Sequence, residues 1–282
     1  MNIVKLKNLS PDITEQLKAI SKSQNKEYHL AFDFDFSDND CIYYLCYDND
    51  KIRSALALFK ITENVYEAIA YTHIRFTNMG YFTAIYNHLI NDLNPDVEIS
   101  FACDKNFPPT AHIIEKFSLQ YSSTELIMSF ALSEYNSQPV KPACARSLHT
   151  NKHESPTDTW GTLKLRPPLV EGFLNNTMKI SCDDNNYKIF YNGNKIGSFI
   201  TEEMSENTVY LFGFEILKKY RQKGFGRLSM GLALQLLKER GIKKLYLQVS
   251  PENKPAYRIY KGLGFKINAE INYYKKAIVS TI

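Results

Sequence analysis

The chain has 282 residues, of which 44% are hydrophobic and 13% aromatic, and its 34 Lys and Arg against 30 Asp and Glu leave a formal net charge of +4. This composition excludes a disordered chain and a strongly basic nucleic-acid binder. No apolar run reaches the roughly 20 residues of a membrane-spanning helix, and residues 1–12 lack the apolar stretch of a signal peptide, so we expect a soluble cytoplasmic protein without membrane association. The five cysteines are scattered without metal-ligand spacing, so no metal is expected.

The first half of the chain alternates strand and helix patterns. We expect a helix around 11–23, strands at 41–48, 51–61 and 65–74, a helix from Tyr81 and a short apolar strand before Asn106. Residues 133–160 then break every periodicity with three prolines and many Ser, Thr and Asn, as a linker does. The length predicts two domains, which we place at 1–132 and 161–282 on either side of the 133–160 linker.

The second half begins with four expected strands and continues with alternating helices and strands. Asn192-Gly193 is the signal of a hairpin turn, and Gly241 is a helix stop. The order is β-β-β-β-α-β-α-β, which predicts a mixed sheet. The expected strands are 163–167, 186–192, 195–201, 208–216, 243–250 and 265–279, with helices at 168–176, 226–241 and 255–262.

The two halves resemble each other. VYEAIAYTHIRFTNMGYF from Val65 and VYLFGFEILKKYRQKGFG from Val209 share a Val-Tyr opening and a Gly-aromatic pair, each 144 positions apart (65 and 209, 80 and 224). A short apolar strand ends near Asn106 in one half and near Asn253 in the other. A repeat of this length indicates a duplicated domain and not a solenoid.

The loop Arg221-Gln222-Lys223-Gly224-Phe225-Gly226 lies between an expected strand and an expected helix. Glycines let the backbone curl, and the first N–H groups of a helix have no internal acceptor, so such a loop can bind a diphosphate. Lys223 or Arg227 can add a charge-assisted contact. The alternative is a glycine loop that merely lets a helix start.

This loop, with the pattern R/Q-x-x-G-x-G, is followed some 25 residues later by N-x-x-A-x-x-x-Y-x-x-x-G-F. Together the two motifs resemble the GNAT superfamily of acyl-CoA-dependent N-acetyltransferases over residues 163–282. The resemblance implies an α/β (α+β) fold of two GNAT-like domains, each a mixed, mostly antiparallel twisted sheet flanked by helices. The second motif is carried by Asn253, Ala256, Tyr260, Gly264 and Phe265.

The resemblance implies an enzyme that transfers an acetyl group from acetyl-CoA directly to a primary amine of a small molecule or peptide. Tyr260 would contact the cosubstrate and protonate the leaving thiolate, and a backbone N–H near Leu217 would face the developing oxyanion. The proton acceptor stays open: Glu215 is the first candidate, and Tyr273 or Tyr274 is a second. The implied cofactor-binding residues are Glu215, Ile216, Leu217, Gln222, Lys223, Gly224, Phe225, Gly226, Arg227, Asn253, Tyr257 and Tyr260.

In the first half, the loop Thr77-Asn78-Met79-Gly80-Tyr81-Phe82 has a phenylalanine at the second glycine and contains no Lys or Arg. Pro108-Pro109 also interrupts the later motif. We therefore expect a degenerate domain that binds CoA poorly or not at all and that shapes the acceptor site. A different reading of the whole chain is a non-catalytic acyl-CoA-binding regulatory or sensor protein. No sequence feature specifies an oligomeric state.

Overall fold

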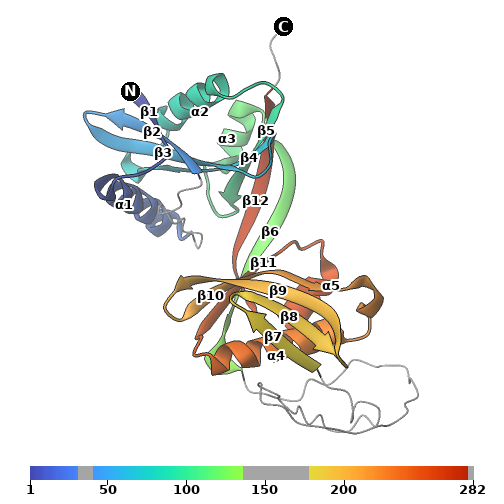
Figure 1. The fold of residues 1–282 in the computed structure, drawn as a ribbon. Coiled ribbons are helices and arrows are strands. Elements are labelled where there is room, and N and C mark those ends of the chain that lie inside the picture. The colour runs from blue at the N-terminus through green and yellow to red at the C-terminus, as the bar shows by residue number, and fades with distance from the viewer. Residues whose placement is uncertain (31–40, 136–177, 279–282) are drawn as a thin grey trace. The chain divides into compact units, whose positions relative to one another are not determined.

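The computed structural model describes residues 1–30, 41–135 and 178–278, and these residues form two compact units (Figure 1). One unit comprises Met1–Leu126 with Asn268–Ile282, and the other comprises Ile127–Ile267. The expected strand 163–167, the expected helix 168–176 and most of the predicted linker lie outside the described residues.

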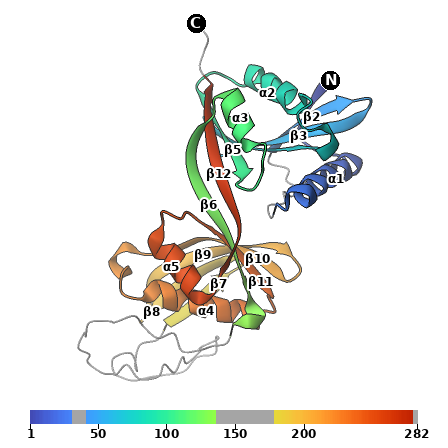
Figure 2. The same cartoon turned by 180° about the vertical axis from the view of Figure 1, so that it is seen from behind.

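The first unit is a sheet with helices on both faces (Figure 2). Its strands lie in the order β1-β2-β3-β4-β5-β12. Helix α1 starts at Pro11, where the Ser10 hydroxyl accepts the Ile13 N–H, and it packs on one face with Leu17 and Ile20 fully buried. Helix α2 packs on the opposite face through Ile85 and Leu89. The elements are β1 (Asn2–Leu6), α1 (Pro11–Tyr28), β2 (Cys41–Asp48), β3 (Lys51–Lys60), β4 (Val65–Thr72), η1 (Ile74–Phe76), α2 (Tyr81–Asp92), β5 (Val97–Asp104) and α3 (Thr110–Phe117).

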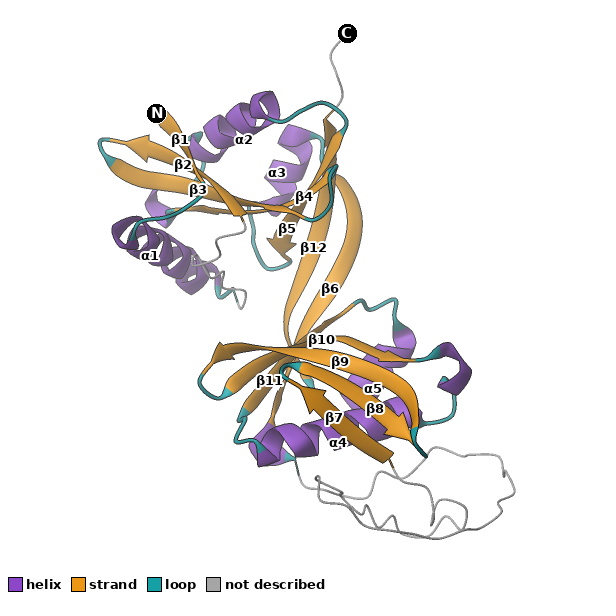
Figure 3. Cartoon of the chain, viewed as in Figure 1, coloured by secondary structure: helices purple, strands orange, loops and turns teal. Residues whose placement is uncertain are grey.

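The second unit has an equivalent strand order, β7-β8-β9-β10-β11-β6, and its helices α4 and α5 pack against each other (Figure 3). Asn192 and Gly193 have φ values of 50° and 78°, which confirms the predicted hairpin. Strand β7 matches none of the expected strands, because the sequence analysis placed no strand between the expected helix at 168–176 and the strand from Asn186. The elements are β7 (Met178–Asp183), β8 (Asn186–Tyr191), β9 (Asn194–Ser205), β10 (Thr208–Ile216), η3 (Lys218–Tyr220), α4 (Phe225–Glu239), β11 (Lys244–Val249) and α5 (Lys254–Leu263).

Each unit takes one strand from the other half of the sequence. In the first unit, residues 271–278 of β12 (Lys266–Ile278) pair antiparallel with residues 97–104 of β5. In the second unit, β6 (Gln120–Ala131) lies beside β11. The equivalent last strands of the duplicated halves are thus exchanged. The predicted domain boundaries at residues 132 and 161 therefore divide the sequence into segments, and each compact unit draws on both segments. Among the described helices, none is long and apolar enough to cross a membrane.

Candidate active site

The second unit opens between two neighbouring parallel strands. Strands β10 and β11 pair from Thr208 with Lys244 to Leu211 with Leu247, and the parallel pairing stops there. Strand β10 continues to Ile216 beside β9, so within the described residues its other edge is open from Phe212 onward. An open strand edge can hydrogen-bond an extended, amide-bearing ligand.

The open part of β10 is also bent. Its register against β9 shifts between Phe212 and Glu215, and Gly213 between them has a φ of +63°. Opposite this shift, a Cβ added at Gly197 of β9 would lie 2.3 Å from the Glu215 carbonyl oxygen, so β9 and β10 approach too closely here for a side chain. Irregular pairing of this kind is frequent beside active sites, because it redirects side chains. Sequence reasoning missed Gly197, although a glycine inside a strand pattern signals such an approach.

The glycine loop exposes backbone donors at the start of α4. Gln222 and Gly224 have φ values of 60° and 84°, and Gly224 is the N-cap residue with no side-chain cap. The first α4 hydrogen bond runs from the Leu228 N–H to the Gly224 carbonyl, at 3.3 Å. The N–H groups of residues 225–227 therefore have no acceptor inside the helix, and they form an anion-binding surface at the positive end of the helix dipole. Helix α5, in contrast, is capped by a side chain.

Side chains of the loop hold its shape. Arg221 donates from Nε to the Ile216 carbonyl at 2.6 Å, which ties the loop to the end of β10. Lys223 donates from Nζ to the Lys219 carbonyl at 3.0 Å. The Phe225 ring is buried 4.7 Å from the ring of Tyr191, so this side chain anchors the helix start.

Two further loop residues have structural explanations besides ligand binding. A Cβ at Gly226 would lie 2.8 Å from Cδ1 of Ile259 on α5, so the glycine permits the close approach of α4 and α5. The Arg227 guanidinium donates to the Gly262 carbonyl at 2.9 Å, near the C-terminal end of α5, where a positive charge is favourable. The backbone N–H groups of both residues remain available to an anion.

Helix α5 brings a tyrosine to the open strand edge. Asn253 caps α5 by accepting the Ala256 N–H at 3.4 Å. Tyr260, further along the same helix, is 5% exposed, and its ring lies 6.4 Å from the ring of Phe214 on β10. Burial raises the pKa of Tyr260 to about 12, so its hydroxyl keeps its proton at neutral pH. Tyr257 is half-buried on the same helix.

The remaining catalytic expectations meet different environments. Glu215 is exposed, and its carboxylate accepts a hydrogen bond from the Ser198 hydroxyl at 3.3 Å. The Leu217 N–H donates to the Ile196 carbonyl at 2.7 Å, so this N–H is not free for an oxyanion, and the expectation of an N–H near Leu217 stays a prediction for its neighbours. Tyr273 and Tyr274 lie on the part of β12 that pairs with β5, in the first unit. In the described part of the chain, no cluster of His, Cys, Asp or Glu could hold a metal ion.

The first unit has the same loop backbone with different side chains. Asn78 and Gly80 have φ values of 62° and 87°, matching the loop of the second unit, and Gly80 caps α2 without a side-chain hydrogen bond. The Phe82 ring packs 5.6 Å from the ring of Phe117, between α2 and α3. At the position of Tyr260, identified by the hydrogen bond that ends the helix, the first unit has Ile114.

The C-terminal part of the chain is similar in sequence to a known family of proteins. Residues 154–265 match the family model described as the acetyltransferase (GNAT) family. The chain is 34% identical over 92 residues to a [ribosomal protein bS18]-alanine N-acetyltransferase of Haemophilus influenzae, covering 32% of this chain and 62% of the relative. It is 28% identical over 93 residues to a spermine/spermidine N(1)-acetyltransferase of Bacillus subtilis, covering 30% of this chain and 61% of the relative. The chain therefore spans about three fifths of the length of these curated relatives.

Solved structures match the whole chain in fold. A GCN5-related N-acetyltransferase from Sphaerobacter thermophilus aligns with a TM-score of 0.69 at 10% identity, covering 99% of this chain and 97% of that one. A tandem GNAT protein from the clavulanic acid biosynthesis pathway aligns with a TM-score of 0.66 at 10% identity, covering 100% and 99%. These similarities confirm the predicted fold class and its tandem arrangement.

Proposed function

We propose that the protein transfers the acetyl group of acetyl-CoA directly to a primary amine, because residues 154–265 match the model of the GNAT acetyltransferase family. The observation that carries the proposal is the combination, in one unit, of an open edge on β10 with an uncapped N-terminus on α4. An extended amide chain suits the first, and a diphosphate suits the second.

The residues present fit the cosubstrate. A Cβ at Gly224 would meet no other atom within 4 Å, so the loop has open space beside its free N–H groups. The residues that we propose hold the diphosphate are Gln222, Lys223, Gly224, Phe225, Gly226 and Arg227, and those that we propose flank the pantetheine arm are Glu215, Ile216, Leu217, Asn253, Tyr257 and Tyr260. When bound, acetyl-CoA supplies the acetyl group on a thioester.

Two side chains manage the protons in this proposal. Glu215 accepts the proton that the amine loses as its nitrogen forms the new C–N bond, directly or through one water. Tyr260 donates its proton to the sulfur as the C–S bond breaks, and it regains a proton from solvent before the next turnover. The bond made and the bond broken share one carbonyl carbon, so no covalent enzyme intermediate is needed. The main contribution of the chain is to hold amine and thioester together.

We propose a primary amine of a small molecule or peptide as the acceptor. The names of the relatives describe acetylation of an alanine in one case and of a polyamine in the other, so amines of both sizes are represented in this part of the family.

Thiol release tests the proposal. The full chain is incubated with acetyl-CoA and a library of peptide and small-molecule amines, and free CoA is measured with a thiol reagent. We expect amine-dependent release, about 100-fold slower in Tyr260→Phe as expected for loss of a general acid. Tyr246→Phe on β11 is the matched control and should resemble the wild type. Tight CoA binding without turnover of any amine would instead indicate a sensor protein.

We also propose that one acetyl-CoA binds per chain, in the second unit. The first-unit loop has no Lys or Arg, and Phe82 occupies the position of Gly226. Titration calorimetry should give a stoichiometry near one, and binding should be weakened at least 10-fold in Gly224→Ala but unchanged in Gly80→Ala. A stoichiometry of two would overturn this division between the units.

A further inference from the structure

The two faces of β9 and β10 in the second unit differ in character. On one face Phe199 and Leu211 are buried. The Phe214 ring, 6.4 Å from that of Phe199, is also 6.4 Å from that of Tyr260 on α5, so this face packs against the helices (Figure 2). Side chains alternate along a strand, and paired residues share a face, so the residues between these point to the opposite side. They are Ser198, Ile200 and Glu202 of β9 and Tyr210, Phe212 and Glu215 of β10, none of which is buried.

Strand pairing arranges these six residues in three rows. The pairs are Ser198 with Glu215, Ile200 with Phe212, and Glu202 with Tyr210. The Ser198 hydroxyl donates to the Glu215 carboxylate at 3.3 Å, so this pair does share a face across the irregular part of β10. The middle row is apolar, and its Phe212 is 40% exposed. A carboxylate therefore lies on either side of an exposed apolar row.

The spacing of the two carboxylates suits a particular length of ligand. Glu215 pairs with Ser198, which lies four positions before Glu202 on β9. At about 3.4 Å per residue, the two outer rows are about 13 Å apart. An extended chain advances about 1.2 Å per bond, so roughly eight to ten methylene groups hold two terminal nitrogens about 11 to 13 Å apart.

An aromatic ring accompanies the second carboxylate. Tyr210, paired with Glu202, donates its hydroxyl to Gln248 Oε1 at 3.1 Å, which fixes the ring on this face of the sheet. An ammonium ion is attracted both by a carboxylate and by the face of an aromatic ring. The row of Glu202 and Tyr210 therefore suits a cation.

Basic side chains flank these rows on the neighbouring strands. Lys188 of β8 pairs with Ser198. On the other side, Lys244 of β11 holds its ammonium group 4.6 Å from the ring centre of Tyr246, which pairs with Tyr210. Both lysines repel an ammonium ion. A ligand with two positive charges is therefore favoured along β9 and β10 and disfavoured across the sheet.

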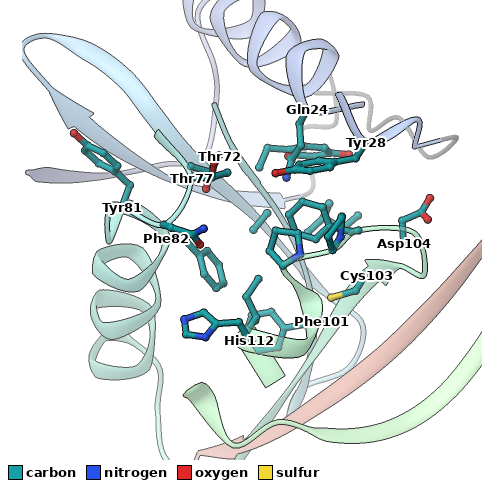
Figure 4. A pocket seen from close by; sticks show the side chains of 18 of the residues that line it. Gln24, Tyr28, Thr72, Thr77, Tyr81, Phe82, Phe101, Cys103, Asp104 and His112 are labelled. Atoms are coloured by element: carbon teal, nitrogen blue, oxygen red, sulfur yellow. The ribbon is translucent and has the colours of Figure 1, made fainter. Parts of the chain in front are cut away.

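The first unit uses the equivalent face as a core. The N–H bonds from Leu217 to Ile196 and from His73 to Arg53 align β9 with β3. At the places of Ser198, Ile200 and Glu202, strand β3 has Ala55, Ala57 and Phe59, which belong to the cluster that packs against α1. Figure 4 shows Gln24 and Tyr28 of the same helix reaching toward a pocket beside this sheet. Core packing thus accounts for these positions in the first unit, and it does not account for two carboxylates in the second.

We propose that the acetyl acceptor is a small diamine whose two nitrogens are joined by an apolar chain of roughly eight to ten carbons. This inference rests on the proposed function. One nitrogen lies at Glu215, the chain lies over Ile200 and Phe212, and the second nitrogen stays protonated at Glu202. The first nitrogen loses one proton to solvent on binding. It then forms the C–N bond and gives a second proton to Glu215, while the C–S bond breaks and the sulfur takes a proton from Tyr260.

The test compares acceptors that differ only in the second charge. Thiol release by the full chain with acetyl-CoA is measured for octane-1,8-diamine and for 8-amino-1-octanol, and the rate for the diamine is halved because it has two equivalent amines. We expect kcat/KM to be about fivefold higher for the diamine, mainly through KM, since an exposed ion pair contributes a factor of this order. Butane-1,4-diamine, which is too short to reach both rows, should show no such advantage over 4-amino-1-butanol.

A matched pair of variants locates the second charge. Glu202→Gln should bring the ratio between octane-1,8-diamine and 8-amino-1-octanol to about one. Glu203→Gln removes the same charge one residue later, where the side chain points to the other face and pairs with Val209, and it should keep the ratio. A ratio of one in the wild type, or a ratio that survives Glu202→Gln, would overturn this inference while acetylation of either compound leaves the proposed function standing. If no amine of any kind is acetylated, the proposed function itself fails.

Moving the carboxylate tests the spacing directly. The double variant Ile200→Glu with Glu202→Gln brings the second carboxylate two residues, or about 7 Å, closer to Glu215. The preferred diamine should then shorten to roughly four to five carbons. An unchanged preference for the eight-carbon diamine would contradict the placement of the ligand along β9. If the double variant does not fold, the comparison of Glu202→Gln with Glu203→Gln still decides the question.

Discussion

Substitution of Gly197 by alanine tests how closely the geometry of β10 controls the proposed reaction. An added Cβ would lie 2.3 Å from the Glu215 carbonyl oxygen and 3.0 Å from Cδ1 of Ile216. The second contact is with the end of a flexible side chain and can relax. The first is with the backbone, and it relaxes only if β9 and β10 separate. The corresponding pair in the first unit accepts a side chain: the Ser54 hydroxyl donates to the Tyr71 carbonyl at 3.1 Å.

The size of the effect follows from the distance. A relaxed C···O contact is about 3.3 Å, so Gly197→Ala must move the Glu215 backbone by about 1 Å. Overpacking of this kind costs about 1–3 kcal/mol of stability. A displacement of 1 Å in a group that positions the reaction can cost roughly 100-fold in rate. We therefore expect kcat/KM to fall about 100-fold in a protein that is still folded at 25 °C.

The assay is steady-state thiol release, with thermal unfolding measured on the same sample. Gly193→Ala, in the hairpin four residues earlier, is the matched control: its Cβ would meet no atom within 4 Å, but its φ is +78°. That variant should lose about 1 kcal/mol through backbone strain and keep its kcat/KM. If Gly197→Ala retains wild-type kcat/KM, the position of Glu215 does not limit the reaction and our reasoning about β10 is wrong.

Three further predictions concern the loop and α5. Gly224→Ala should raise KM for acetyl-CoA at least 10-fold with a stability loss of about 1–2 kcal/mol from its φ of +84°, and unchanged KM would contradict the loop assignment. Asn253→Ala should lose about 1 kcal/mol of stability through the lost cap, whereas Asn253→Ser should keep it, as chemical denaturation would measure. Burial raises the pKa of Tyr260 from 10.0 to about 12, so its contribution to stability is complete below pH 10 and is lost as the pH rises to 12. Denaturation at pH 9 and 11.5 should show a smaller loss in Tyr260→Phe.

Local signals in the sequence predicted the parts of the site that depend on local conformation. The start of α4 at the glycine loop follows from residues that tolerate positive φ, and Gly224 has it. The hairpin at Asn192-Gly193 follows from the same chemistry. Strand alternation likewise predicted 208–216 as β10, because its side chains alternate between the core and the other face.

Pairing between distant segments could not be read in the same way. The alternation in β12 shows that it is a strand, but not that its partner is β5 in the first unit, because many strands offer the same hydrogen-bonding edge. The Leu217 N–H depends on a distant segment in the same way: whether it is free depends on Ile196 of β9, which the sequence around the loop does not specify. Gly226 likewise depends on Ile259 of another helix.

Comparison of the two units separates what maintains the backbone from what performs the chemistry. The Leu217 N–H donates to Ile196, and at the equivalent place the His73 N–H donates to Arg53 at 2.9 Å. These main-chain bonds are made by any residue except proline, so the loop survives a change of side chains. The proposed chemistry is more easily lost, because the isoleucine at the position of Tyr260 has no proton to donate to a thiolate. A copy that keeps its open strands but loses these side chains therefore keeps the fold without the chemistry that we propose for the second unit.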